Sequence, residues 1–161
     1  RGPIDAEELV TGGFWSTYWY GNHIYGTEII RGLDVLTLEA SEHITANEIA
    51  AAGLADYDGV LNPQQQLPVT WPDHPLVALA LLNQLARRGA GDAATVKAAS
   101  DAIEAARASF DAGKSDRRSA RSIEGLAAKL ASSDDGKPAA EVMRAVAAKL
   151  REPQITSNGA D

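Results

Sequence analysis

The segment at residues 14–38, FWSTYWYGNHIYGTEIIRGLDVLTL, constrains the fold of this chain more than any other. It carries six of the nine aromatic residues of the chain within 25 of its 161 residues. Gly21-Asn22 separates two runs rich in aromatic and β-branched residues, and such a pair is typical of a tight hairpin turn, which needs positive φ. Arg31-Gly32 marks a second turn ahead of LDVLTL. The segment therefore predicts an antiparallel three-stranded β-meander.

A lone three-stranded sheet with so many aromatic side chains would expose a large apolar face. We therefore expect this meander to belong to a larger assembly or to lie against the helices that follow it. A binding platform for sugars or aromatic ligands is an alternative, and the interior of a sheet is the simpler explanation. The candidate partner-binding residues are Trp15, Tyr18, Trp19, Tyr20, Tyr25 and Trp71.

A short helix and a proline-rich stretch follow the meander at residues 41–72. Thr45 and Glu48 have the spacing of a capping box, and Gly53 is a plausible stop for the helix. The next stretch is expected to be an extended arm or linker, because prolines favour extended chain. Its apolar residues, Leu61, Leu67, Val69 and Trp71, suggest that the arm packs onto a surface.

The second half of the chain reads as four amphipathic helices, at about 75–88, 92–112, 116–132 and from 138 onward. Short loops between them predict an antiparallel bundle. The second helix carries an apolar stripe at heptad spacing, at Val96, Ala99, Ile103, Ala106 and Phe110. We expect this stripe to pack inside the bundle, with homo-oligomerisation as the alternative.

The predicted fold class is thus α+β, with an N-terminal antiparallel meander and a C-terminal helical bundle. The predicted units are 1–40 for the meander, 41–72 for the short helix and linker, 73–152 for the bundle and 153–161 for a flexible polar tail.

Charge and composition exclude several classes of function. Residues 1–70 hold ten acidic and two basic residues, so their net charge is -8, which argues against nucleic-acid binding there. No apolar run reaches the roughly 18–20 residues that span a bilayer. The chain has no cysteine, which excludes disulfides and thiolate metal sites. The basic run at residues 114–121 is expected to be a solvated helix start, with anion binding as the alternative.

No set of residues predicts catalysis, a metal or a cofactor. His23, His43 and His74 lie in different segments without metal-ligand spacing, and Ser16 lacks a His and Asp constellation. Glu28 and Asp34 are expected to be solvated at a turn or a sheet edge rather than to act as a catalytic pair. The chain is therefore predicted not to be an enzyme.

The sequences GGFWSTYWY, IYGTEI and RGLDVLTL resemble the last blade of bacterial LVIVD-repeat β-propeller proteins. The sequences SEHITANEIAAA and NPQQQLPVTWPDHPLVALALLNQLARRG are similar to the tail that often follows the propeller in actinobacterial members. The chain departs from the pattern at Gly21-Asn22, where Asn-Gly is usual, and it holds at most one blade, whereas a propeller needs several.

The resemblance implies a non-enzymatic interaction or scaffold module of an exported β-propeller protein, located outside the cell or in the cell envelope. Its partner would be the missing propeller blades or another protein chain. The chain begins with Arg1 rather than Met, which predicts that any signal peptide lies outside it. The alternatives are a lid or support for a propeller hydrolase or oxidoreductase, and a ligand-binding protein that stacks its ligand on Trp15, Trp19 and Trp71.

Overall fold

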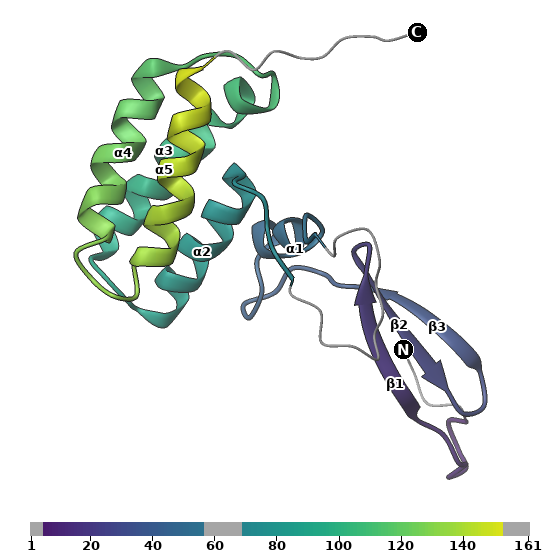
Figure 1. The fold of residues 1–161 in the computed structure, drawn as a ribbon. Coiled ribbons are helices and arrows are strands. Elements are labelled where there is room, and N and C mark those ends of the chain that lie inside the picture. Colours follow the sequence, from purple (N-terminus) through teal and green to yellow (C-terminus); the bar gives the residue numbers. More distant parts are fainter. Residues whose placement is uncertain (1–4, 57–68, 153–161) are drawn as a thin grey trace, which may run out of the picture.

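The computed structural model describes residues 5–56 and 69–152 of this α+β chain, as a small antiparallel sheet followed by five helices (Figure 1). The strands are β1 (Phe14–Tyr20), β2 (His23–Glu28) and β3 (Gly32–Thr37). The helices are α1 (Ala46–Ala52), α2 (Pro75–Arg88), α3 (Ala93–Asp111), α4 (Arg117–Leu130) and α5 (Lys137–Arg151). The predicted fold class, a meander followed by a helical bundle, is confirmed.

The sheet is a meander in the order β1-β2-β3, with each pair antiparallel. Gly21 and Asn22 both have positive φ, 54° and 65°, so they form the primed turn that the sequence predicted. The β2–β3 turn ends at Gly32, whose φ of 85° favours glycine. The register shifts between Phe14 and Ser16, which leaves Trp15 at a β-bulge.

Because side chains alternate along a strand, the register divides the aromatic residues between two faces. We name these the tyrosine face and the tryptophan face. The tyrosine face carries Tyr18, Tyr20, Tyr25, Leu33 and Val35, and the tryptophan face carries Phe14, Trp19, Ile24 and Leu36. The sheet therefore has apolar side chains on both sides.

The helices begin and end where local chemistry favours it. Thr45 and Glu48 form the predicted capping box of α1, and His74 caps α2 through an imidazole nitrogen that accepts from the Leu76 amide. Gly89, with φ of 62°, ends α2 in the left-handed conformation. Asp92 and Asp116 cap α3 and α4 by accepting backbone amides of their first turns.

Helices α2–α5 form a bundle with a continuous apolar core (Figure 1). In α3 the predicted stripe faces this core, and Val96, Ala99, Ile103 and Ala106 are all buried in it. The stripe is therefore used for packing within the chain and is not available for oligomerisation. Many core positions are alanine, which allows the helices to approach closely.

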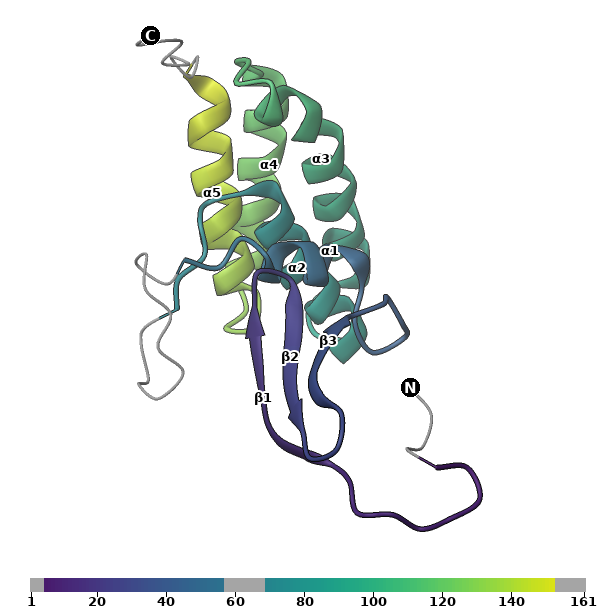
Figure 2. The same ribbon diagram turned by 90° about the vertical axis from the view of Figure 1, so that its right-hand side faces the viewer.

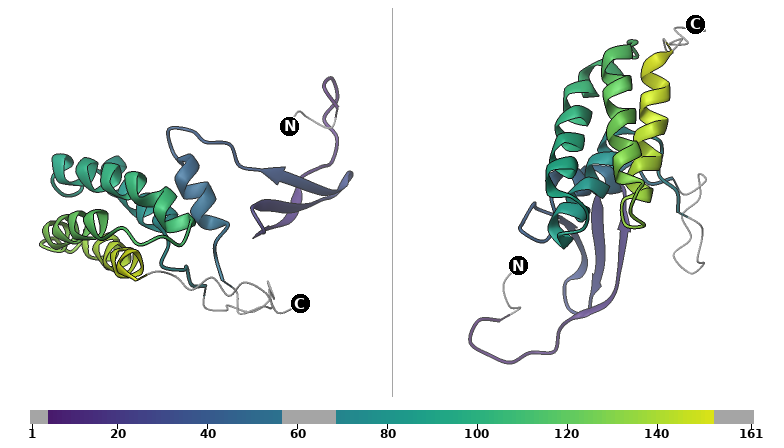
Figure 3. Two further views of the ribbon diagram at one scale, coloured as in Figure 1. Left: turned by 90° about the horizontal axis from the view of Figure 1, so that it is seen from above. Right: turned by 90° about the vertical axis from the view of Figure 1, so that its left-hand side faces the viewer.

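Helix α1 packs on the outside of α2, through Ala51, Val77 and Ala80. In contrast, none of the three strands packs against a helix in the described ranges. Figures 2 and 3 show the sheet extending away from the bundle, beyond α1. The tip of the first hairpin comes close to the end of α1, where the Asn22 side chain occupies the space that a Cβ on Gly53 would need. The expectation that the sheet could lie against the following helices is not met.

The linker region is described only at its two ends. Asp56 and Thr70 form an isolated β-bridge, in which each backbone amide donates to the carbonyl of the other residue, at 2.8 and 3.3 Å. Val69 and Trp71 flank Thr70 on either side, and both are exposed. The predicted packing of Leu61 and Leu67 and the predicted flexible tail at 153–161 fall outside the described residues.

Candidate interaction surface

The turn between β2 and β3 is organised around the Glu28 carboxylate. Its oxygens accept hydrogen bonds from the backbone amides of Gly13, Ile30 and Arg31, at 2.7, 2.9 and 2.6 Å. The Gly13 and Arg31 amides are the main cause of the lowered pKa of this carboxyl group. Glu28 thus ties the segment before β1 to the turn after β2, which fixes the end of the sheet.

The prediction that Glu28 and Asp34 are solvated is wrong. They are only 6% and 4% exposed, and both project on the tryptophan face. Glu28 is buried because the turn supplies backbone donors that replace water. These bonds occupy both carboxylate oxygens, so Glu28 acts as a fixed structural anion.

The first residue of β1 shields part of the tryptophan face. The Phe14 ring lies over Gly26, where an added Cβ would come within 2.5 Å of a ring carbon. Glycine at this position of β2 therefore lets the aromatic ring cover the backbone directly. The bulge that follows turns Trp15 outward, and its side chain is 76% exposed.

Large exposed apolar side chains concentrate at the N-terminal end of the molecule. Those that the structure describes are Leu9, Val10, Phe14, Trp15, Tyr20, Ile29, Ile30, Leu33, Val35, Leu38, Val69 and Trp71. All of them lie outside α2–α5. The helical bundle buries its apolar residues in the ordinary way, whereas the sheet leaves Leu33 60% and Val35 53% exposed. An exposed apolar patch of this kind is typical of a surface that contacts another protein or a ligand.

The structure divides the six predicted partner-binding residues into separate places. Tyr18, Tyr20 and Tyr25 share the tyrosine face, and Tyr18 and Tyr25 are direct cross-strand partners. Trp19 lies on the opposite face, and Trp15 lies at the bulge between them. Trp71 lines a groove on the helical unit instead. A stacking platform of Trp15, Trp19 and Trp71 is therefore not assembled in this structure.

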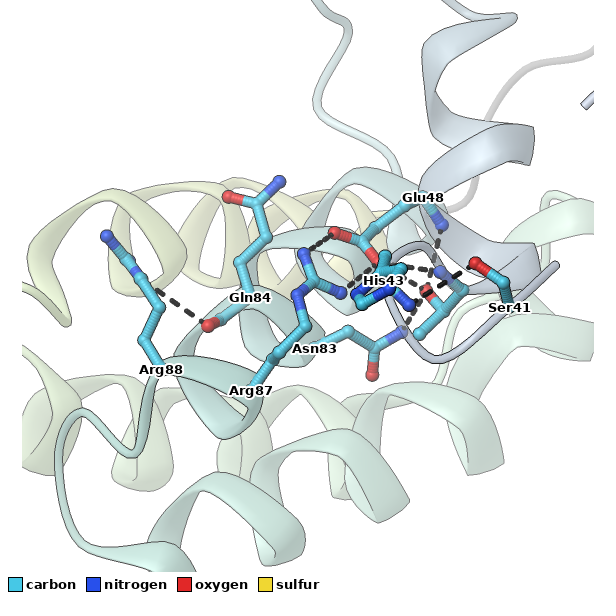
Figure 4. Close-up of polar contacts among 8 residues, drawn as sticks. Ser41, His43, Glu48, Asn83, Gln84, Arg87 and Arg88 are labelled. Atoms are coloured by element: carbon cyan, nitrogen blue, oxygen red, sulfur yellow. Dashed lines mark hydrogen bonds and ion pairs between the residues drawn. The ribbon is translucent and has the colours of Figure 1, made fainter.

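Sequence reasoning did not find the polar cluster that joins α1 to α2 (Figure 4). The Glu48 carboxylate accepts from both terminal nitrogens of Arg87, at 2.6 and 2.8 Å, and from the amide and hydroxyl of Thr45. Asn83 donates to the Thr45 hydroxyl at 2.9 Å. The Arg87 hydrogen bonds, ahead of the Thr45 bonds, lower the pKa of Glu48 to about 2, so the carboxylate stays ionised and is unsuited to proton transfer.

Next to this cluster, a groove of about 480 Å³ lies between α1, α2 and α5. Its walls are mainly apolar side chains, including Ala51, Leu81 and Val142, and Trp71 also lines it. The acidic groups that line it are Glu48, which is paired with Arg87, and Glu141. The described lining of this groove offers apolar contact and includes no set of acid, base and nucleophile.

Within the ranges 5–56 and 69–152, no group of histidine and acidic side chains could hold a metal ion. His23 and His74 each contact an aromatic ring, of Tyr25 and Phe110 respectively. In the same ranges no helix is long and apolar enough to cross a bilayer.

No family model, no curated protein and no solved structure matches this chain. The resemblance to LVIVD-repeat propellers therefore stays a prediction, which depends on the residues quoted for it.

Proposed function

We propose that this chain is a non-enzymatic interaction module whose sheet is completed by β-structure from a partner. The partner is either another protein chain or the other blades of a β-propeller to which the sheet belongs. The observation that carries the proposal is a sheet with apolar side chains on both faces and, among residues 5–56 and 69–152, no helix packed against either.

A sheet that is apolar on both sides fits the middle of a layered structure better than its surface. An antiparallel sheet at a protein surface keeps one face polar, whereas a sheet covered on both sides carries apolar side chains on both faces. Tyr20, Leu33 and Val35 supply the exposed apolar area on the tyrosine face. A propeller blade meets this description, because each blade packs between two others.

The two edges of the sheet are not equally suited to pairing with another strand. β1 has a bulge beside Trp15, and bulges are one way in which natural sheets block an edge. β3 pairs with β2 in unbroken register over all six of its residues and contains neither proline nor lysine. We therefore assign β3 as the edge that accepts a partner strand, which would give backbone hydrogen bonds in addition to face contacts.

An exported protein with a place outside the cell or in the cell envelope is part of the same proposal. It follows from the propeller resemblance alone. Fractionation of the native cells into medium, envelope and cytoplasm, followed by detection of this chain in each fraction, would test it separately.

A reconstitution experiment tests the binding proposal. The purified chain is mixed with an LVIVD-repeat propeller that lacks its last blade, and complex formation is followed by sedimentation velocity and tryptophan fluorescence. We expect a one-to-one complex. The substitution Val35→Lys should weaken it strongly, because it places a charge on the tyrosine face and leaves the bundle core untouched. Ala128→Lys, at an exposed position of α4, is the matched control and should bind as the unmodified chain does.

Hydrogen exchange on the isolated chain gives a second readout. A sheet that awaits a partner should exchange its amides much faster than the bundle helices do. If β1–β3 are protected as strongly as α3–α5 in the monomer and no complex forms, the sheet is self-sufficient and the proposal fails.

A further inference from the structure

Opposite charges gather at the two ends of this molecule. Residues 5–56 contain nine acidic residues and one basic residue, Arg31, a net charge of -8. At the start of α4, Lys114, Arg117, Arg118 and Arg121 form a run in which Asp116 is the one acidic residue, a net charge of +3. We name these four basic residues the arginine cluster.

The arginine cluster lies at the end of the bundle that is farthest from the sheet. The amide of Asp116 donates to the carbonyl of Leu150 at 2.7 Å, so α4 begins where α5 ends. Figures 1 and 2 show this end of the bundle pointing away from the strands. The acidic residues at 5–56 of the same chain are therefore too far away to neutralise the arginine cluster.

The four basic side chains of this cluster are exposed, so they can contact another molecule. Arg118 lies near the capping carboxylate of Asp116 and helps to lower its pKa, and Lys114, Arg117 and Arg121 make no ion pair within the ranges that the structure describes. Other bases near this end are already engaged. Arg151 pairs with Glu124, and Lys149 donates to the carbonyl of Asp73.

At the other end, the acidic side chains lie mainly before and after the strands. Asp5, Glu7 and Glu8 precede β1, and Glu39 and Glu42 follow β3, and all five are exposed. They leave both faces of the sheet open to the β-rich partner proposed above. An additional contact through these acids is thus compatible with that function and independent of it.

We propose that the arginine cluster binds the acidic segments beside the sheet of a second copy of this chain. Two copies lying antiparallel would join each cluster to the acids of the other copy, so both contacts close around one two-fold axis. Charge complementarity favours a second copy as the partner, because the chain carries exposed acidic residues beside its sheet that its own arginine cluster cannot reach. The contact is polar and exposed, so it gives orientation and reversible association.

The test is sedimentation velocity of the full chain at about 0.1 M and about 1 M salt, where the Debye length is about 10 Å and about 3 Å. We expect a reversible dimer at low salt that dissociates at high salt. Exposed ion pairs each change an association constant by a factor of roughly 1.4 to 5. The two-fold axis places the three arginines in both contacts, so reversing Arg117, Arg118 and Arg121 to Glu removes about six pairs and should weaken the dimer at least about sevenfold.

Two further variants make the test specific. The substitutions Arg88→Glu, Lys97→Glu and Lys129→Glu change the net charge equally at the opposite end of the bundle, and they should leave the dimer intact. The substitutions Glu7→Lys, Glu8→Lys and Glu39→Lys should weaken it, and combining them with the reversed arginine cluster should restore it. Helical circular dichroism confirms that each variant is folded.

Three outcomes would overturn the proposal. The chain could stay monomeric at low salt, or it could form a dimer that salt and charge reversal leave unchanged, which would indicate association through the apolar sheet. It could also stay monomeric while the arginine cluster binds a fluorescent DNA duplex, which would assign the cluster to a different partner. A monomer at low salt would leave the reconstitution with a propeller unaffected, and a salt-insensitive dimer through the sheet would agree with the proposed function, so the two proposals fail separately.

Discussion

Replacing Glu48 by glutamine tests how α1 is held on the bundle. The substitution keeps the shape of the side chain but removes the charge that Arg87 and the Thr45 amide stabilise. The pKa of Glu48 falls from 4.5 to about 2 in the fold, which corresponds to about 3 kcal/mol of preferential stabilisation of the ionised form. Because the Arg87 side chain is about one-third exposed and is screened by water, we take the expected loss for Glu48→Gln as about 1–3 kcal/mol.

This loss should be local. Helix α1 lies outside α2 and contributes no residue to the core of α2–α5. We therefore expect the amides of Ile49–Gly53 to exchange roughly 5–150 times faster in Glu48→Gln, while those of α3–α5 keep their protection. Hydrogen exchange with mass spectrometry at neutral pH measures both.

The stabilisation by ionised Glu48 should depend on pH in a definite direction. A lowered pKa stabilises the fold above the unfolded value of 4.5, and this stabilisation is lost as pH falls through about 2. The difference between the original chain and Glu48→Gln should therefore vanish over that interval, and carbon NMR of the Glu48 carboxyl should titrate near the lower value.

Glu141→Gln is the matched control, since Glu141 lines the same groove on α5 and is exposed. It should leave α1 unchanged. Equal loss of protection in every helix after Glu48→Gln, or no loss in α1, would refute the reasoning.

Three other predictions concern separate parts of the fold. Burial lowers the pKa of His74, whose ring nitrogen caps α2. The stability that this cap gives is therefore present above about pH 6.5 and is lost as pH falls through the lowered pKa. His74→Asn keeps a cap and should remove this pH dependence in thermal melts followed from pH 5 to 8. Ile103→Ala should lower the free energy of unfolding in urea by about 2–5 kcal/mol, because Ile103 is fully buried. Leu33→Ala should change the same free energy by less than about 0.5 kcal/mol, because Leu33 is exposed. Equal losses would mean that Leu33 is buried in solution. Gly125→Ala should stabilise the fold by about 0.5–1 kcal/mol and so raise the melting temperature, because an added Cβ in the middle of α4 meets no atom within 4 Å.

The sequence predicted the elements well because their signals are local. Thr45 with Glu48, Asp92 and Gly89 are end signals that act within four residues of the backbone groups they satisfy, and the observed bounds differ from the predicted ones by a residue or two. The Gly21-Asn22 turn is local in the same way, and it sets the register of the first hairpin as far as Ser16, before the bulge at Trp15.

The arrangement of the candidate surface could not be predicted in the same way. Glu48 meets Arg87 across 39 residues, and no periodicity links the two. The burial of Glu28 depends on amides from both sides of the sheet end, including Gly13, which is 15 residues away. Trp71 is aromatic like the residues of the meander, but it lines the groove on the helices instead, and no local pattern in the sequence indicates this.

The bridge between Asp56 and Thr70 has a practical consequence for engineering. It holds the two flanks of the intervening stretch side by side, so the ends of any inserted sequence are already brought together. Closing a longer connection costs only about 0.6 kcal/mol for each doubling of its length. A fluorescent reporter or an affinity tag inserted there would leave the sheet and the bundle in place, which makes this junction the natural site for labelling the protein in binding experiments.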